Sequence, residues 1–479
     1  MSLWRTKSLE FLKAEAESGK DKLERALGPV SLVMLGIGAI IGAGLFSITG
    51  IAAAEHAGPA IIISFILAAV GCAFAGMCFS ELASMIPVSG GVYTYTYATM
   101  GEFIAWIMGW LMVIEYSIGA ATVSISWSAY IVALFQDFGI QIPHYLIASP
   151  WQPTILADGT TVFGIMNLPA AAIVVLISCL LIFGGIKKSA KANAIFVVVK
   201  VTVVLVFICL GAFYIDFANY EPFIPANTGT FGEFGWSGII RAAAIVFFAY
   251  IGFDAVSTAA QESKKPQRDL PIGIIGSLII CTLLYIAFAL VLLGLVPFQS
   301  LNTAAPIAAA VDVTPFKWLI GLIKIAIIAG LSSVILVLLL GQSRIFYVMS
   351  KDGLIPKMFS LIHHRYHTPW FSSLFIMVFV ALIGAFAPIS LAAAMASIGT
   401  LLAFAIVCAG VLVLRKTRPD FVRPFKTPLV PLVPILGILS CVALMFSLSL
   451  HSWIGLIVWI ALGMIFYFAY SFKHSHMNK

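Results

Sequence analysis

The sequence predicts an all-α integral membrane protein with about twelve transmembrane helices. Of its 479 residues, 61% are hydrophobic and only 10% are charged, whereas soluble globular proteins carry roughly 25% charged residues. The apolar residues are gathered into twelve long runs, and a helix needs roughly 20 such residues to cross a bilayer. The basic residues lie mostly in short segments between alternate runs. These three observations exclude a soluble fold.

The twelve runs set the order of the expected elements. Because lipid offers no partner to an unpaired backbone group, each run is expected to be helical. The segment 1–27 before them is polar with a few apolar residues, and it predicts either an amphipathic helix on the membrane surface or a disordered tail. The runs are 29–54, 59–85, 102–134, 167–186, 192–215, 237–260, 271–297, 316–348, 369–387, 390–414, 429–449 and 452–472.

The distribution of Lys and Arg predicts the orientation. If both termini lie in the cytoplasm, most basic residues fall on the inner side, and the two longest outer loops, 135–166 and 216–236, contain none. This asymmetry favours an even number of spans in the cytoplasmic membrane, with both ends inside. It also accounts for the net charge of +7 without nucleic acid as a partner.

Several functional classes find no support in the motifs. The sequence has no Walker A motif, so ATP is not an expected ligand. No histidine lies at mid-span and no cysteine pair has CxxC spacing, so neither a metal site nor a cofactor is expected. We find no convergent nucleophile or metal cluster, and we therefore expect a protein that is not an enzyme.

Two runs are interrupted where a helix should be continuous. The first contains GIGAIIGAGLF at 36–46 and the sixth contains FFAYIGFD at 247–254. They stand five spans apart, and because five is odd, a second set of five helices would be inverted relative to the first. Interrupted helices at matching positions of two halves indicate a transporter's binding site. The expected divisions are a cytoplasmic segment 1–27, a first repeat 28–215, a second repeat 237–414, two further helices in 429–472 and a cytoplasmic tail 473–479.

The break in the first run is suited to an anion. If the helix unwinds at Gly42, Ala43 and Gly44, freed N–H groups and the positive end of the next half-helix point at one spot, where a carboxylate fits. The alternative is a close helix contact, because Gly38 and Gly42 form a GxxxG pair.

The break in the sixth run offers the complementary chemistry. It would release carbonyl groups near Phe248, Ala249 and Ile251, which accept hydrogen bonds from an ammonium group. Phe247 and Phe248 would either wall a pocket or pack in the core. Together the two breaks match the head group of an α-amino acid.

Four ionisable residues lie within runs, where charge is costly and often functional. Lys200 suits proton coupling, because a desolvated lysine can lose its proton near neutral pH; the alternative is a structural cation paired with a carboxylate. Glu115 is a candidate partner for Lys200 or for a substrate amine. Asp254 is a candidate for gating or coupling, although a structural link from span six to a neighbour is favoured. Lys324 is expected to extend outward to the membrane surface.

Several stretches, taken in order, resemble the amino acid–polyamine–organocation (APC) superfamily and, within it, the bacterial-type members of the cationic amino acid transporter family. Besides the two interrupted segments they are PQRDLPIG at 266–273, MSKDGLIP at 349–356, SIGTLLAF at 397–404, RPFK at 423–426 and PVSGGVYTY at 87–95.

The resemblance implies a five-plus-five inverted repeat with broken helices 1 and 6 and two additional C-terminal helices. In such proteins the substrate carboxylate meets positions matching Gly42, Ala43 and Gly44, and Ile41 belongs to the same segment. The amine meets carbonyls matching Ile40, Phe248 and Ile251. Ala43 stands where many relatives have Ser or Thr, so one hydroxyl is missing.

The resemblance further implies that Lys200 replaces a sodium ion and couples transport to protons. Helices 1 and 6 would rock against helices 3, 4, 8 and 9. We therefore expect a proton-coupled symporter of neutral or cationic L-amino acids. The alternatives are an amino acid or polyamine exchanger without proton coupling, and a sensor that binds amino acids without transporting them.

Overall fold

The computed structural model describes residues 5–7, 27–86, 91–151, 154–155, 161–184, 186–260, 263–303, 305–312, 315, 317–364 and 368–476. Within these ranges, eight helices are long and apolar enough to cross a membrane, and four shorter apolar helices accompany them. Each of the twelve runs overlaps one of these helices, and Gly44–Met85 joins the end of the first run to the second. The predicted all-helical membrane protein is confirmed.

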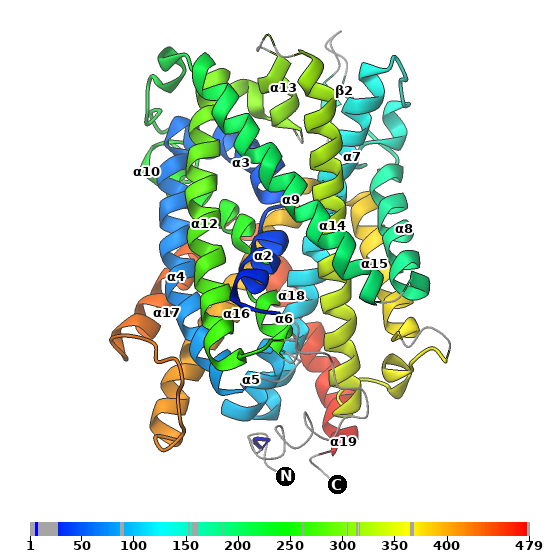
Figure 1. Ribbon diagram of the computed structural model, residues 1–479, viewed down its shortest axis with the longest axis vertical. Coiled ribbons are helices and arrows are strands. Elements are labelled where there is room, and N and C mark those ends of the chain that lie inside the picture. Colours follow the sequence, from blue (N-terminus) through cyan, green and yellow to red (C-terminus); the bar gives the residue numbers. More distant parts are fainter. Residues whose placement is uncertain are drawn as a thin grey trace.

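The helices follow the expected order (Figure 1). The α-helices are α2 (Pro29–Ile40), α3 (Thr49–Ala52), α4 (Ile61–Met85), α5 (Gly91–Thr99), α6 (Glu102–Val113), α7 (Gly119–Asp137), α8 (Leu168–Gly184), α9 (Ile186–Gly211), α10 (Gly235–Val246), α11 (Ala255–Thr258), α12 (Pro266–Leu295), α13 (Pro306–Asp312), α14 (Lys317–Lys351), α15 (Trp370–Phe386), α16 (Ile389–Thr417), α17 (Leu432–Ser447), α18 (Leu450–Phe466) and α19 (Phe472–His474). Short π- or 3₁₀-helical turns used below are η1 (Gly44–Ile48), η2 (Ala53–Ala57), η4 (Ile114–Ile118), η8 (Phe247–Tyr250) and η11 (Lys357–Ser360).

One small element departs from the all-helical expectation. Strands β1 (Thr154–Ile155) and β2 (Thr161–Val162) pair in antiparallel fashion in the segment between α7 and α8. They are only two residues long and lie between membrane helices, so they leave the fold class unchanged.

The long helices pack in two groups. In one group α12 packs against α2 and α4, and α10 packs against α4. In the other, α14 packs against α7, and α15 packs against α8. Helix α9 contacts α2, α12 and α14, and Figure 1 shows it running obliquely across the last two. The first and sixth spans therefore share one group with their neighbours α4 and α12.

The described parts of the two terminal segments meet at one end of the molecule. The Lys7 ammonium lies 2.5 Å from a carboxylate oxygen of Asp352, and the Glu102 N–H donates to the Arg5 carbonyl. The Ser475 hydroxyl donates to the Glu102 carboxylate at 2.5 Å. The amphipathic helix expected in 1–27 lies outside the described residues apart from 5–7 and 27, as does the 87–90 part of PVSGGVYTY.

Candidate functional site

The first membrane span is broken where the glycine cluster predicts it. Helix α2 ends at Ile40, and Ile41 has extended backbone angles (φ −71°, ψ 105°). The helical path resumes when the N–H groups of Leu45 and Phe46 both donate to the Gly42 carbonyl at 3.1 Å. The N–H groups at the start of this second half precede its first helical hydrogen bond, as at any helix N-terminus.

The sixth span is broken in the corresponding way. Helix α10 passes into the turn η8, and Ile251 is then extended (φ −58°, ψ 134°). Gly252 follows with a φ of +114°, a conformation that side chains with a Cβ rarely adopt. The chain becomes helical again at α11. Carbonyl groups of η8 therefore lack part of the regular helical hydrogen bonding.

The two breaks pack directly against each other through glycine. A Cβ added to Gly44 would lie 2.3 Å from the Cα of Ala249, and one added to Gly252 would lie 2.9 Å from the Ala39 carbonyl oxygen. Each break thus needs a residue without a side chain so that the other can approach. This reciprocal contact brings the predicted N–H donors and carbonyl acceptors to one place.

A small cavity lies at this junction. Among the residues proposed from the sequence, Ile40, Gly42, Ala43, Gly44, Phe248 and Ile251 line it. The rest of its lining consists of Ala39, Gly119, Val123, Val334 and Leu338. None of these side chains carries a charge or a hydrogen-bonding group, so every polar group they offer to a ligand belongs to the backbone.

Three of the proposed residues do not line the cavity. The Ile41 carbonyl faces Lys200 instead. The Phe247 ring packs edge-on against Phe404 with centroids 5.5 Å apart, which is the packing alternative considered for it. The Ala249 carbonyl accepts a hydrogen bond from the Tyr285 hydroxyl at 2.8 Å.

Tyr285, on α12, also reaches the first break. Its hydroxyl lies 2.9 Å from the Ile40 carbonyl oxygen as well as 2.8 Å from that of Ala249. A hydroxyl has one proton to donate, so it serves one carbonyl at a time and links the two broken helices. No sequence signal indicates this role, since Tyr285 sits inside an unbroken apolar run.

Lys200 lies against the first break. Its side chain on α9 is fully buried, and its ammonium donates to the carbonyls of Gly38 and Ile41, the latter at 2.9 Å. Among the described residues it forms no ion pair with Glu115. A buried charge needs compensation, which is the reason to expect a carboxylate partner. In the structure two carbonyl groups at the end of α2 provide part of this compensation instead.

Glu115 and Asp254 form a separate buried cluster. Asp254 accepts a hydrogen bond from the Tyr116 hydroxyl, which joins the third span to the sixth. Glu115 interacts electrostatically with Asp254, and both residues are about 1% exposed. The Tyr116 bond agrees with the expected linking role of Asp254.

Lys324 forms an ion pair with the neighbouring helix. It is only 4% exposed, and its ammonium lies 2.8 and 2.7 Å from the two carboxylate oxygens of Asp137 at the end of α7. Asp137 is 41% exposed and adjoins the segment predicted as an outer loop. That Lys324 extends outward to the membrane surface stays a prediction; in the structure an acidic partner on the neighbouring helix holds it.

Comparisons with known proteins agree with this architecture. Residues 27–467 match the family model described as amino acid permease. The chain is 43% identical to the branched-chain amino acid permease BcaP of Bacillus subtilis, over all of this chain and 99% of that protein. It is 41% identical to the methylthioribose transporter of the same organism, over the full length of both.

Plant proteins are also similar. The vacuolar cationic amino acid transporter 4 of Arabidopsis thaliana is 36% identical over 88% of this chain and 68% of its own length. The chain therefore belongs to the amino acid permease family of the APC superfamily, as a multi-pass membrane transporter and not an enzyme.

Proposed function

We propose that this protein imports L-amino acids with apolar side chains together with protons, by alternating access. The carrying observation is the cavity at the paired helix breaks, with backbone polar groups on both broken helices and an otherwise apolar lining. Its volume of about 10 Å³ is that of about one water molecule, so the breaks must move apart to admit the substrate. The free N–H groups near Gly42–Gly44 would hold the substrate carboxylate, and the carbonyls of Ile40, Phe248 and Ile251 would hold its amine.

The proposed substrate class follows from the part of the cavity wall that α7 and α14 contribute. Gly119 and Val123 on α7 and Val334 and Leu338 on α14 complete the lining. A cationic side chain there would lie against apolar groups without a carboxylate, which is costly. The similarity to BcaP supports branched-chain amino acids as the first substrates to test.

The proposed proton coupling rests on Lys200. Its amine would take up and release a proton in each transport cycle, and the charged form would hold the first break more strongly because charge-assisted hydrogen bonds are about twice as strong as neutral ones. Glu115 and Asp254 are secondary candidates for this step. An exchanger without proton coupling is the principal alternative.

The remaining expectations belong to the same proposal. The protein would lie in the cytoplasmic membrane with both termini inside, as its loop charges suggest. Residues 28–215 and 237–414 would form the two inverted repeats, and the group containing α2 and η8 would move against the group containing α7, α8, α14 and α15.

A second substrate has a specific reason to be tested. The methylthioribose transporter is almost as similar to this chain as BcaP. Methylthioribose lacks a carboxylate and an amine, so it would leave the backbone groups at both breaks without their charged partners. We therefore favour the amino acid.

The test is uptake into liposomes that contain the purified protein under an inward proton gradient. We expect radiolabelled leucine to accumulate, with unlabelled isoleucine and valine as competitors and neither arginine nor methylthioribose competing at the same concentration. Accumulation of arginine or methylthioribose, with leucine excluded, would overturn the proposed substrate class.

A further inference from the structure

Two sequence stretches that the transport proposal does not use meet in the structure. Residues 266–273 begin α12, and residues 423–426 lie in the segment between α16 and α17. Together they border an open groove of about 610 Å³. Gln267 and Arg268 contribute from the start of α12, Ile272, Ile275 and Ile279 from further along it, and Phe425 from the facing segment.

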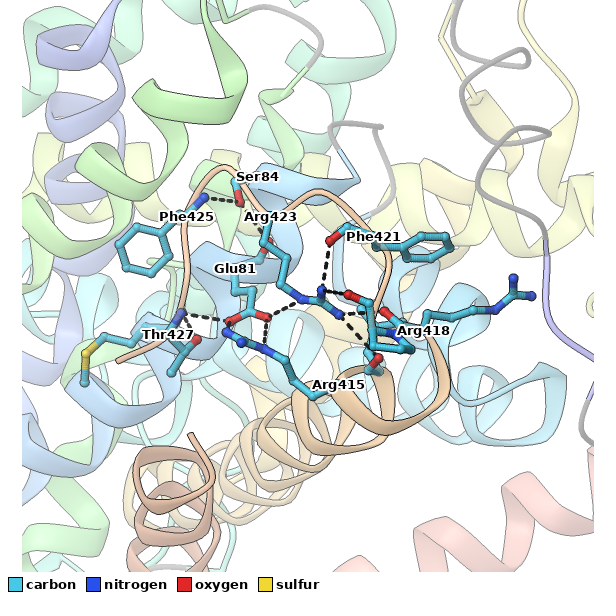
Figure 2. A network of polar contacts seen from close by, with 11 residues as sticks. Glu81, Ser84, Arg415, Arg418, Phe421, Arg423, Phe425 and Thr427 are labelled. Atoms are coloured by element: carbon cyan, nitrogen blue, oxygen red, sulfur yellow. Dashed lines mark hydrogen bonds and ion pairs between the residues drawn. The ribbon is translucent and has the colours of Figure 1, made fainter. Parts of the chain in front are cut away.

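The wall formed by the 423–426 segment is held firmly in place (Figure 2). The buried Glu81 carboxylate on α4 accepts two hydrogen bonds from Arg415, at 2.9 and 2.8 Å, and one from the Thr427 N–H at 2.8 Å. Arg423 Nε lies 3.2 Å from the same carboxylate. The groove therefore has a preorganised wall, and the single Glu81 carboxylate offsets one of the two positive charges of Arg415 and Arg423.

The polar end of the groove carries a positively charged side chain. Arg268 is exposed, and within the described ranges no ion pair involves its guanidinium. Two exposed lysines lie near the groove lining in the sequence: Lys265 three residues before Arg268, and Lys426 directly after Phe425. In addition, Pro271 has no N–H for the Gln267 carbonyl, which therefore lacks its regular helical hydrogen bond. This end suits an anionic group that also carries a donor.

The rest of the groove is apolar and follows a helix face. Ile272, Ile275 and Ile279 are spaced three and four residues apart, so they lie along one side of α12. Ile272 is 39% exposed and Ile279 is 56% exposed, as expected for side chains that face hydrocarbon in a membrane. A soluble anion would leave this stripe unused, whereas an acyl chain would cover it.

We propose that this groove binds one anionic phospholipid. Its phosphate lies at Arg268, a headgroup hydroxyl donates to the Gln267 carbonyl, and an acyl chain follows the isoleucines of α12. The inference does not depend on which solute the protein transports.

Native mass spectrometry of the purified full-length protein tests this site. Dioleoyl phosphatidylglycerol and dioleoyl phosphatidylcholine are titrated separately, and glycerol phosphate is added as a headgroup without acyl chains. One basic residue near a membrane surface contributes about 1 kcal/mol to the binding of anionic lipid. We therefore expect Arg268→Gln to bind phosphatidylglycerol about fivefold more weakly, with phosphatidylcholine binding unchanged.

Two further variants separate the site from its surroundings. Lys357→Gln removes an exposed charge on η11, outside the groove, and should bind phosphatidylglycerol as the wild type does. Ile275→Trp fills the apolar part without a change in charge and should also weaken binding. The proposal is overturned if Arg268→Gln binds as the wild type does, if Lys357→Gln loses as much affinity, or if glycerol phosphate competes as well as the lipid.

Discussion

The Lys200 ammonium nitrogen lies 2.9 Å from the carbonyl oxygen of Ile41, the residue at which the first membrane helix breaks. The same ammonium donates to the Gly38 carbonyl one turn earlier. A single buried cation on α9 therefore holds the end of α2. Any change in its protonation would act directly on the segment proposed to bind the substrate carboxylate.

The contact between the two breaks predicts a strict size limit at Gly44. A methyl group there would lie 2.3 Å from the Ala249 Cα, so Gly44→Ala should push the broken helices apart. Overpacking of this kind costs about 1–3 kcal/mol, and we expect a lower melting temperature and loss of leucine uptake. Gly321→Ala is the matched control, since a Cβ at Gly321 meets nothing within 4 Å. Equal behaviour of the two variants would refute the close contact.

The cavity wall predicts a change in substrate size. Val334 lines the cavity beside Gly42, so Val334→Ala should enlarge the space for the substrate side chain. Pocket changes of one or two methyl groups alter selectivity about 10- to 200-fold, and we expect uptake of phenylalanine to rise relative to valine. Val175→Ala, at an exposed position on α8, should leave the ratio unchanged. An unchanged ratio in Val334→Ala would remove this residue from the substrate site.

The Tyr285 hydroxyl predicts a stabilising link between the broken helices. Tyr285→Phe keeps the ring and removes the donor shared by Ile40 and Ala249. Loss of one such bond costs about 0.5–1.5 kcal/mol, so the variant should melt at a lower temperature. Tyr145→Phe, at an exposed position, serves as the control. A melting temperature equal to that of the wild type would show that the link carries no stability.

Two substitutions of Asp254 distinguish a structural hydrogen bond to Tyr116 from a role in carrying the coupling proton. Asp254→Asn keeps an oxygen that can accept a hydrogen bond from Tyr116 but cannot take up and release a proton. We expect this variant to retain proton-driven uptake. Asp254→Leu should lose uptake, because it also removes the hydrogen bond that joins the sixth span to the third. If Asp254→Asn instead transports by exchange alone, Asp254 carries the coupling proton.

The elements of the fold were largely predictable because the physical signals were local. Each apolar run had to be helical in a membrane, and the breaks fell at Gly42–Gly44 and after Phe248 because glycine and polar residues interrupt otherwise continuous runs. The five-span separation of the two breaks predicts an inverted repeat, and matching interrupted helices predict a shared binding site. In the structure the two breaks contact each other through Gly44 and Gly252.

The remainder of the cavity could not be predicted from the sequence. Val123, Val334 and Leu338 lie in unbroken apolar helices, where a residue facing a cavity has the same composition as one facing lipid or core. Tyr285 was missed for the same reason. The Lys324–Asp137 pair joins residues 187 positions apart, and no periodicity connects them.

The most direct test of the central claim compares proton-driven accumulation with exchange in liposomes. Lys200→Ala and its matched control Lys324→Ala each remove one lysine from a membrane helix, but only the first lysine contacts the break. We predict that Lys200→Ala abolishes leucine accumulation under an inward proton gradient and retains leucine exchange, while Lys324→Ala accumulates leucine. Accumulation by Lys200→Ala equal to that of the wild type would contradict the proposed role of this lysine in proton coupling.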